Sequence, residues 1–441
     1  MARLSHPQPE PEAFHFFRGA DISPQIEFDD LIGMRRGFLH FASLMKKAVL
    51  SSLRAARPAK TRHEHVIFAM HRTKYAQLAP FANVLAGKPL YLLAPWSLER
   101  ITEFNAYIQA SDRDWQMLEP AFPPAFWRDA VLNLPRWVII ALGSPRLAAR
   151  RVAQFAEFYG LAYGIFLVVE RAGAKAIFSS YEDTPWSGTA TQILRGSGVI
   201  SVNTMHGNCY PNRQYFDYSL VFGAYHKRYL ETQTGSSSQF VISGSATIAD
   251  SGARPRPESA AKLLYFDQTA CDMFPPESKS GVLEMLAAVL DGVPGTDLTV
   301  KPHPAGADAY LDGFLVARPS VARLQGNSGK SVAETLDGYG ISLCCFSTTG
   351  LEAIGNAVVS LFLNPGNKLS AGPLAFMGEF VITSDQDLVP LVRKLISDPD
   401  FYRAYLDRER RVLGEFYSLG KFDHAGFLRK IGVLGASAAI S

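Results

Sequence analysis

The stretch ISLCCFSTTGLEAIGNAVVSLFLN (341–364) decides the fold class. Its opening run, ISLCCF (341–346), and its closing run, VVSLFLN (358–364), are apolar and of strand length. The segment between them predicts a helix from about Gly350. A strand, a helix and a second strand in succession are typical of a parallel sheet whose faces are covered by helices.

The same alternation continues outward in two series. The first series has the strand candidates 65–70, 89–95, 174–180, 198–204 and 218–223, with a mostly helical region over 97–170. The second has 262–266, 296–302, 341–346 and 358–364, a helix over 280–290, and an amphipathic helical tail over 398–434. The pattern predicts an α/β protein with two Rossmann-like, doubly wound domains that face a central cleft.

Length supports two domains, because one core stops growing at about 250–300 residues and the chain has 441. The polar segment ADSGARPRP (249–257) is typical of a linker. We therefore expect an N-terminal arm and basic helix over 1–60, a first domain over 61–250 and a second over 258–441. Two interpretations of the basic helix stay open, an ordinary solvated face and a helix that lies on an anionic membrane surface.

Composition narrows the class of protein. The net charge of +3 is too small to indicate a nucleic-acid partner. The four cysteines have no CxxC spacing and no histidine cluster around them, so we expect no metal site, and they suit a reducing, cytoplasmic compartment. The most apolar run, 158–169, is shorter than the ~20 residues that span a bilayer, which predicts no transmembrane helix.

Polar residues follow three strand candidates of the second series. Asp267 and Gln268 follow the first, Lys301 begins KPHP (301–304) after the second, and STTG (347–350) follows the third. Since parallel strands place their carboxyl ends at one edge, these groups should face one crevice.

The segment STTGLEAIG (347–355) has a capping-box pattern, with Thr349 as the expected cap and Glu352 three residues later. A helix that begins here would offer free N–H groups to a phosphate, and Ser347 and Thr348 would add hydroxyl donors. A plain helix cap after a buried strand is the alternative.

In KPHP, Pro302 and Pro304 fix the loop around His303. Such a rigid loop can present an imidazole to a phosphate and stabilise a leaving group. The alternative is a histidine that caps its own loop.

In the first series, the strand over 174–180 leads to Glu182 and Asp183, and the strand over 198–204 leads to His206. Two adjacent carboxylates raise the pKa of one of them and can supply a general base. A capped turn is the alternative for the acidic pair. His206 either orients a substrate or packs under its own loop.

These motifs resemble those of bacterial GT-B enzymes that use CMP-sugars: polysialyltransferases, lipooligosaccharide sialyltransferases and capsule Kdo transferases. The resemblance is carried by the acidic pair Glu182-Asp183, by His303-Pro304 and by Ser347-Thr348. The paired histidines, His206 within HG and His303 within HP, also resemble those of teichoic-acid glycerophosphotransferases of the same fold.

The resemblance implies a cytoplasmic glycosyltransferase, and we expect a CMP-sugar of sialic acid or Kdo as the donor and a surface glycan or glycolipid as the acceptor. Lys301, Pro304, Thr349 and Gly350 would join His303, Ser347 and Thr348 around the phosphate, with Asp267 and Gln268 beside them. No metal or further cofactor is expected. A CDP-glycerol glycerophosphotransferase, a UDP-sugar epimerase and a non-enzymatic polysaccharide-assembly protein stay open as alternatives.

Overall fold

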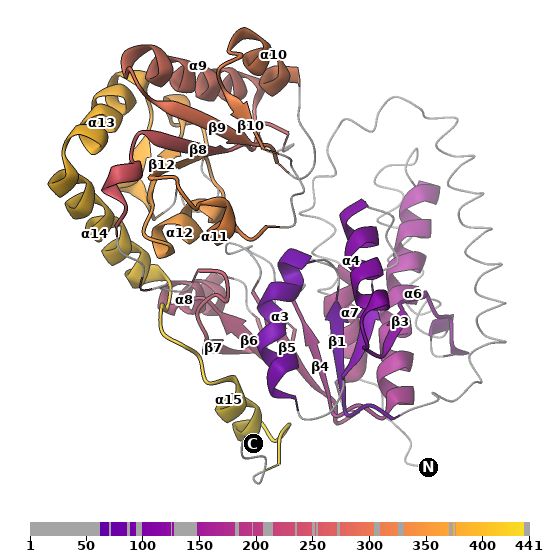
Figure 1. The fold of residues 1–441 in the computed structure, drawn as a ribbon. Coiled ribbons are helices and arrows are strands. Elements are labelled where there is room, and N and C mark those ends of the chain that lie inside the picture. Colours follow the sequence, from indigo (N-terminus) through magenta and orange to yellow (C-terminus); the bar gives the residue numbers. More distant parts are fainter. Residues whose placement is uncertain are drawn as a thin grey trace.

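The protein forms two parallel sheets, one in each half of the chain (Figure 1). The structure is a computed structural model. It describes residues 62–69, 72–85, 89–93, 99–124, 126–127, 148–180, 185–195, 197–205, 215–233, 236–248, 252, 255–270, 274–303, 309–324, 330–369, 374 and 376–435. The expected N-terminal arm and basic helix (1–60) lie outside these residues.

The first sheet contains seven described strands in the order β3-β2-β1-β4-β5-β6-β7. They are β1 (His65–Ala69), β2 (Leu90–Leu93), β3 (Trp115–Met117), β4 (Ala176–Ser179), β5 (Ile200–Thr204), β6 (Tyr218–Val221) and β7 (Gln239–Ile242). The helices of this half are α3 (Arg72–Val84), α4 (Glu99–Ala110), α6 (Ala148–Ala172), α7 (Pro185–Leu194) and α8 (Ala224–Gln233).

Both faces of this sheet are covered, which explains why its strands are apolar without alternation. On β1, Val66 and Phe68 pack in one cluster with the side chains of α6 and α7. Ile67 points to the opposite face and packs with Leu78 and Phe81 of α3. A strand that is buried on two sides favours apolar residues on both faces, as at Val66, Ile67 and Phe68.

The second sheet contains six described strands in the order β10-β9-β8-β11-β12-β13, all parallel. They are β8 (Lys262–Phe266), β9 (Asp297–Lys301), β10 (Ala322–Arg323), β11 (Ile341–Cys344), β12 (Val359–Leu363) and β13 (Val381–Ile382). Its helices are α9 (Pro276–Gly292), α10 (Ala309–Ala317), α11 (Val332–Thr335), α12 (Thr348–Gly355), α13 (Asp385–Ser397) and α14 (Pro399–Phe416).

The predicted fold class is confirmed, and each strand that the sequence indicated is present. The described strands that the sequence did not indicate are β3 and β7 in the first half and β10 and β13 in the second. All four lie at the edges of the sheets. Edge strands are short and partly exposed, as the three residues of β3 are, so they lack the apolar run that marks an inner strand.

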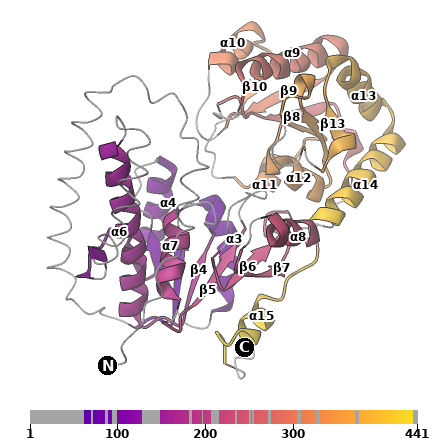
Figure 2. The ribbon, with the colours of Figure 1, turned by 180° about the vertical axis from the view of Figure 1, so that it is seen from behind.

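The chain returns to the first sheet after α14. Figures 1 and 2 both show the segment beyond α14 passing α8 and ending in α15 (His424–Lys430) beside α3. Phe427 and Leu428 of α15 are buried in the cluster that α3 and α4 form with this sheet. The range 258–441 that the sequence assigned to the second domain therefore ends in a helix that packs in the first.

Aromatic side chains join the two halves where α8 meets the end of α14. The rings of Phe222 and Tyr417 stack with centroids 5.3 Å apart, and the ring of Tyr225 lies 4.9 Å from that of Phe416. A Cβ added at Gly223 would lie 1.9 Å from the backbone oxygen of Phe416, so only glycine permits this approach. Packed side chains therefore connect the two domains where α8 meets α14.

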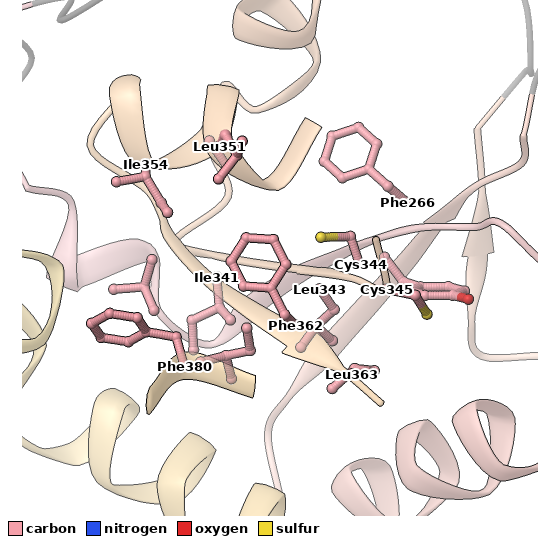
Figure 3. Packing of buried hydrophobic residues seen from close by; sticks show 14 of the residues in the cluster. Phe266, Ile341, Leu343, Cys344, Cys345, Leu351, Ile354, Phe362, Leu363 and Phe380 are labelled. Atoms are coloured by element: carbon pink, nitrogen blue, oxygen red, sulfur yellow. The ribbon is translucent and has the colours of Figure 1, made fainter. Parts of the chain in front are cut away.

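Among the described helices, none is both long enough and apolar enough to cross a membrane. Cys344 and Cys345 form no disulfide, and both are fully buried. Their sulfur atoms lie on opposite sides of the backbone at the end of β11 (Figure 3).

Candidate functional site at the end of the second sheet

The strand order of the second sheet reverses between β8 and β11. The chain proceeds from β8 to β9 on one side, and later enters β11 on the other side of β8. Ligands of open α/β sheets bind beyond the carboxyl ends of the strands at such a point. The strands β9, β8 and β11 are neighbours, and each leads into one of the predicted groups, so the structure brings these groups to one edge. The groups are Lys301-Pro302-His303 at the end of β9, Asp267-Gln268 after β8 and Ser347-Thr348-Thr349-Gly350 after β11.

Asp267 and Gln268 lie at this edge, directly after β8. The side-chain oxygen of Gln268 accepts hydrogen bonds from the backbone N–H of Cys345 at 3.1 Å and of Phe346 at 2.9 Å. Asp267 accepts from the N–H and the hydroxyl of Thr269, at 3.0 and 2.8 Å. Both side chains are buried. Gln268 therefore fixes the end of β8 relative to the residues that follow β11, whereas Asp267 fixes the turn that follows β8.

Helix α12 begins at Thr348, and its cap is Ser347. The hydroxyl of Ser347 accepts a hydrogen bond from the N–H of Thr349 at 3.2 Å, and the hydroxyl of Thr349 donates to it at 2.7 Å. The expected capping box between Thr349 and Glu352 is thus wrong. Ser347 has an extended backbone conformation, with φ −78° and ψ 142°, which is the geometry of an N-cap residue. Because Ser347 is the N-cap, Thr349 already lies inside the helix.

Gly350 lets this helix lie directly on the sheet. A Cβ at this position would come within 2.6 Å of the sulfur of Cys344 and 2.8 Å of the ring of Phe362. Figure 3 shows Leu351 and Ile354 of α12 above Cys344 and Phe362. The close packing holds the first turn of α12, with its N–H groups not yet paired within the helix, at the strand ends.

Lys301 supplies positive charge at the end of β9. Its ammonium group donates to the hydroxyl of Thr335 on α11 at 3.1 Å. Burial lowers its pKa from the ordinary value, and the nearby carboxyl group of Glu352 opposes that change. His303 is partly exposed two residues further on, and Pro304 lies outside the described residues. A partly buried ammonium group at the carboxyl end of a strand is suited to a phosphate.

Glu352 is a residue of this site that the sequence reasoning assigned wrongly. Burial raises the pKa of its carboxyl group to about 8, against the smaller effects of a hydrogen bond with Thr247 and of Lys301. A carboxyl group with a pKa near neutrality at a strand-end edge is typical of a functional site. The sequence does contain an indication of this role, because Glu352 is the only acidic residue in the otherwise apolar run LEAIG (351–355). The capping-box interpretation assigned that glutamate to the helix start instead.

The predicted first-domain residues Glu182, Asp183 and His206 lie outside the described residues. The strands that precede them, β4 and β5, are neighbours in the sheet, with Ser179 paired to Asn203 at their carboxyl ends. Within the part of the chain that the structure describes, no group of three or more His, Cys, Asp or Glu side chains could hold a metal ion.

The two Rossmann-like domains define the GT-B arrangement, and solved structures share it. No family model matches the chain, and no curated protein matches it. A protein from Listeria monocytogenes, provisionally assigned as a UDP-N-acetylglucosamine 2-epimerase, is similar with a TM-score of 0.54 and 9% identity over 85% of this chain and 98% of that one.

Two further structures show the same likeness. The S. aureus MnaA co-structure with UDP gives a TM-score of 0.51 at 10% identity, covering 85% of this chain and 98% of that one. A histidine-to-asparagine variant of the wall teichoic acid polymerase TagF gives 0.51 at 10% identity, covering 91% and 97%. At such identities the likeness establishes the fold, and the fold extends over most of the chain.

Proposed function

We propose that the protein is a glycosyltransferase that moves a sugar, sialic acid or Kdo, from a CMP-sugar to a bacterial surface glycan or glycolipid. The observation that carries the proposal is the convergence of Lys301, His303 and the Ser347-capped start of α12 at the switch point of the second sheet. Hydroxyl, imidazole, ammonium and backbone N–H groups are donors suited to one phosphate. The UDP bound by the similar MnaA structure supports a nucleotide in this fold.

In the proposed reaction, an oxygen of the acceptor forms a bond to the anomeric carbon as the bond from that carbon to the CMP phosphate breaks. Glu182 or Asp183 takes the proton of the acceptor hydroxyl, and His206 orients the sugar or the acceptor. The negative charge that develops on the phosphate is met by His303, Lys301 and the first turn of α12. These groups provide the positive charge, so the proposed reaction uses no metal ion.

The second candidate is a glycerophosphotransferase that uses CDP-glycerol. The similar TagF structure favours it, because the likeness covers 91% of this chain. The paired histidines His206 and His303 would then both be required. Both candidate reactions release CMP, so the nucleotide alone does not separate them, whereas their donors do.

The test is a thermal-shift screen with CMP, CDP, UDP and GDP, followed by CMP-sialic acid, CMP-Kdo and CDP-glycerol as donors. CMP at 100 times its Kd should stabilise the protein by about 2.7 kcal/mol, which is a shift of about 5 to 10 °C for domains of this size. The shift should be lost in Lys301→Met and His303→Ala.

Lys262→Met is the matched control, because Lys262 is an exposed lysine at the opposite end of the neighbouring strand β8. A shift with UDP or GDP and none with CMP would refute the cytidine donor. Release of CMP from CDP-glycerol, with none from either CMP-sugar, would favour the second candidate. No shift with any nucleotide would refute both.

A further inference from the structure

A chain of polar side chains connects helix α3 of the first domain to helix α12 of the second. It begins at Gln77 of α3, whose amide nitrogen donates to the hydroxyls of Ser245 at 3.3 Å and of Thr247 at 3.4 Å. The amide oxygen of Gln77 accepts from the N–H of Ala246 at 3.1 Å. One buried side chain thus holds three successive residues of the segment that follows β7.

The series of polar side chains continues from Thr247 into the second domain. The hydroxyl of Thr247 bonds to Ser245 at 3.1 Å on one side and to the carboxyl group of Glu352 on the other. Lys301 of β9 is the charged group that acts on this carboxyl group, and Lys330 in turn acts on Lys301. A single hydroxyl therefore lies between the first domain and the ionisable pair at the strand ends.

Such a contact has consequences for both domains. Thr247 lies two residues before the expected linker (249–257), so a change in the angle between the domains would move its hydroxyl relative to Glu352. The carboxyl group is partly buried, so loss of the Thr247 hydroxyl would remove a neutral donor that favours its ionised form beside Lys301. Gln77 restrains Thr247 from the first domain and so restricts this movement.

We infer that Thr247, held by Gln77, is a positioning residue that couples the arrangement of the two domains to Glu352 and Lys301 in the nucleotide site. The inference rests on the proposed function because it takes Glu352 and Lys301 as parts of that site. It adds a residue from outside the second domain to the groups that determine nucleotide affinity.

The experiment compares Thr247→Val, which removes the hydroxyl at similar volume, with Thr247→Ser, which keeps it. Titration calorimetry with CMP should show a Kd about fivefold or more higher for Thr247→Val, and a Kd close to that of the unaltered protein for Thr247→Ser. Gln77→Met should weaken CMP binding in the same direction. In a Glu352→Gln background, Thr247→Val should have no further effect on the Kd.

A second readout needs no ligand. The Thr247 hydrogen bond favours the ionised carboxyl group, so its loss should lower the melting temperature more at pH 9 than at pH 5, and this pH dependence should vanish in the Glu352→Gln background. A purely structural threonine would give the same loss at both pH values and in both backgrounds, and that result would overturn the inference. If the unaltered protein does not bind CMP, the proposed donor fails, and the ligand-free readout alone decides whether the coupling exists.

Discussion

Replacement of Glu352 by glutamine should stabilise the protein at alkaline pH while weakening nucleotide binding. Burial raises the pKa of this carboxyl group from 4.5 to about 8. A raised carboxyl pKa means that its contribution to stability is fully present below pH 4.5 and is lost as the pH rises to about 8. Glutamine resembles the protonated form and does not titrate, so Glu352→Gln should avoid this loss.

The size of the effect follows from the two pKa values. At about 1.4 kcal/mol for each pH unit, the interval from 4.5 to about 8 corresponds to at most about 5 kcal/mol. The side chain keeps part of its surface exposed, so solvent screening should reduce the difference to about 2 to 4 kcal/mol at pH 8 and above. At pH 5 the two proteins should unfold at nearly the same denaturant concentration.

The assay is urea unfolding of both proteins at pH values from 5 to 9, with CMP binding measured on the same samples. Glu284→Gln is the matched control, because Glu284 is exposed on α9. A difference in the free energy of unfolding that does not change between pH 5 and pH 9 would refute the reasoning, since it would show that Glu352 does not titrate in this range. A gain in stability together with a loss of binding is typical of a residue retained for function.

Three further predictions concern packing and pH. Gly350→Ala should lower the free energy of unfolding by about 1 to 3 kcal/mol and reduce CMP binding, because its Cβ would overlap the sulfur of Cys344. Gly313→Ala is the control, since its Cβ would have nothing within 4 Å. Equal urea midpoints for the two variants would contradict the prediction. Burial lowers the pKa of His226 from 6.5 to about 4. This histidine should therefore remove about 3 kcal/mol of stability as the pH falls across that interval, a loss that His226→Gln should lessen in urea unfolding at pH 7 and pH 4. Deletion of 421–441 removes α15 from the first core, so it should lower the melting temperature and increase proteolysis within 62–124, while an unchanged digest would argue against the packing described.

The inner strands could be predicted from the sequence because burial on two faces leaves a continuous apolar run, as in KLLYF and ISLC. The edge strand β3 could not, because all three of its residues keep some exposure and its pairing with β2 leaves no periodic pattern. The grouping of Asp267, Lys301 and Ser347 followed from parallel strand order alone. The detailed roles of these side chains depend on which neighbour each one meets.

Glu352 shows why the rest of the site was beyond the sequence. The pattern of a hydroxyl followed three residues later by a glutamate is the same whether the glutamate caps the helix or meets a partner far along the chain. Thr247 lies 105 positions earlier (352 − 247), in a segment without a strand or helix pattern, so local spacing carries no information about their contact. The return of α15 to the first sheet is equally non-local, since its amphipathic pattern fits either domain.

The return of α15 also determines the order in which the protein can be completed on the ribosome. The cluster that covers one face of the first sheet contains Phe427, Leu428 and Val433, which are synthesised after every strand of the second sheet. The second domain can therefore complete its sheet while the first domain still exposes the apolar surface of α3 that α15 will cover. Nascent chains of the first half should present this strip to chaperones until the last helix emerges.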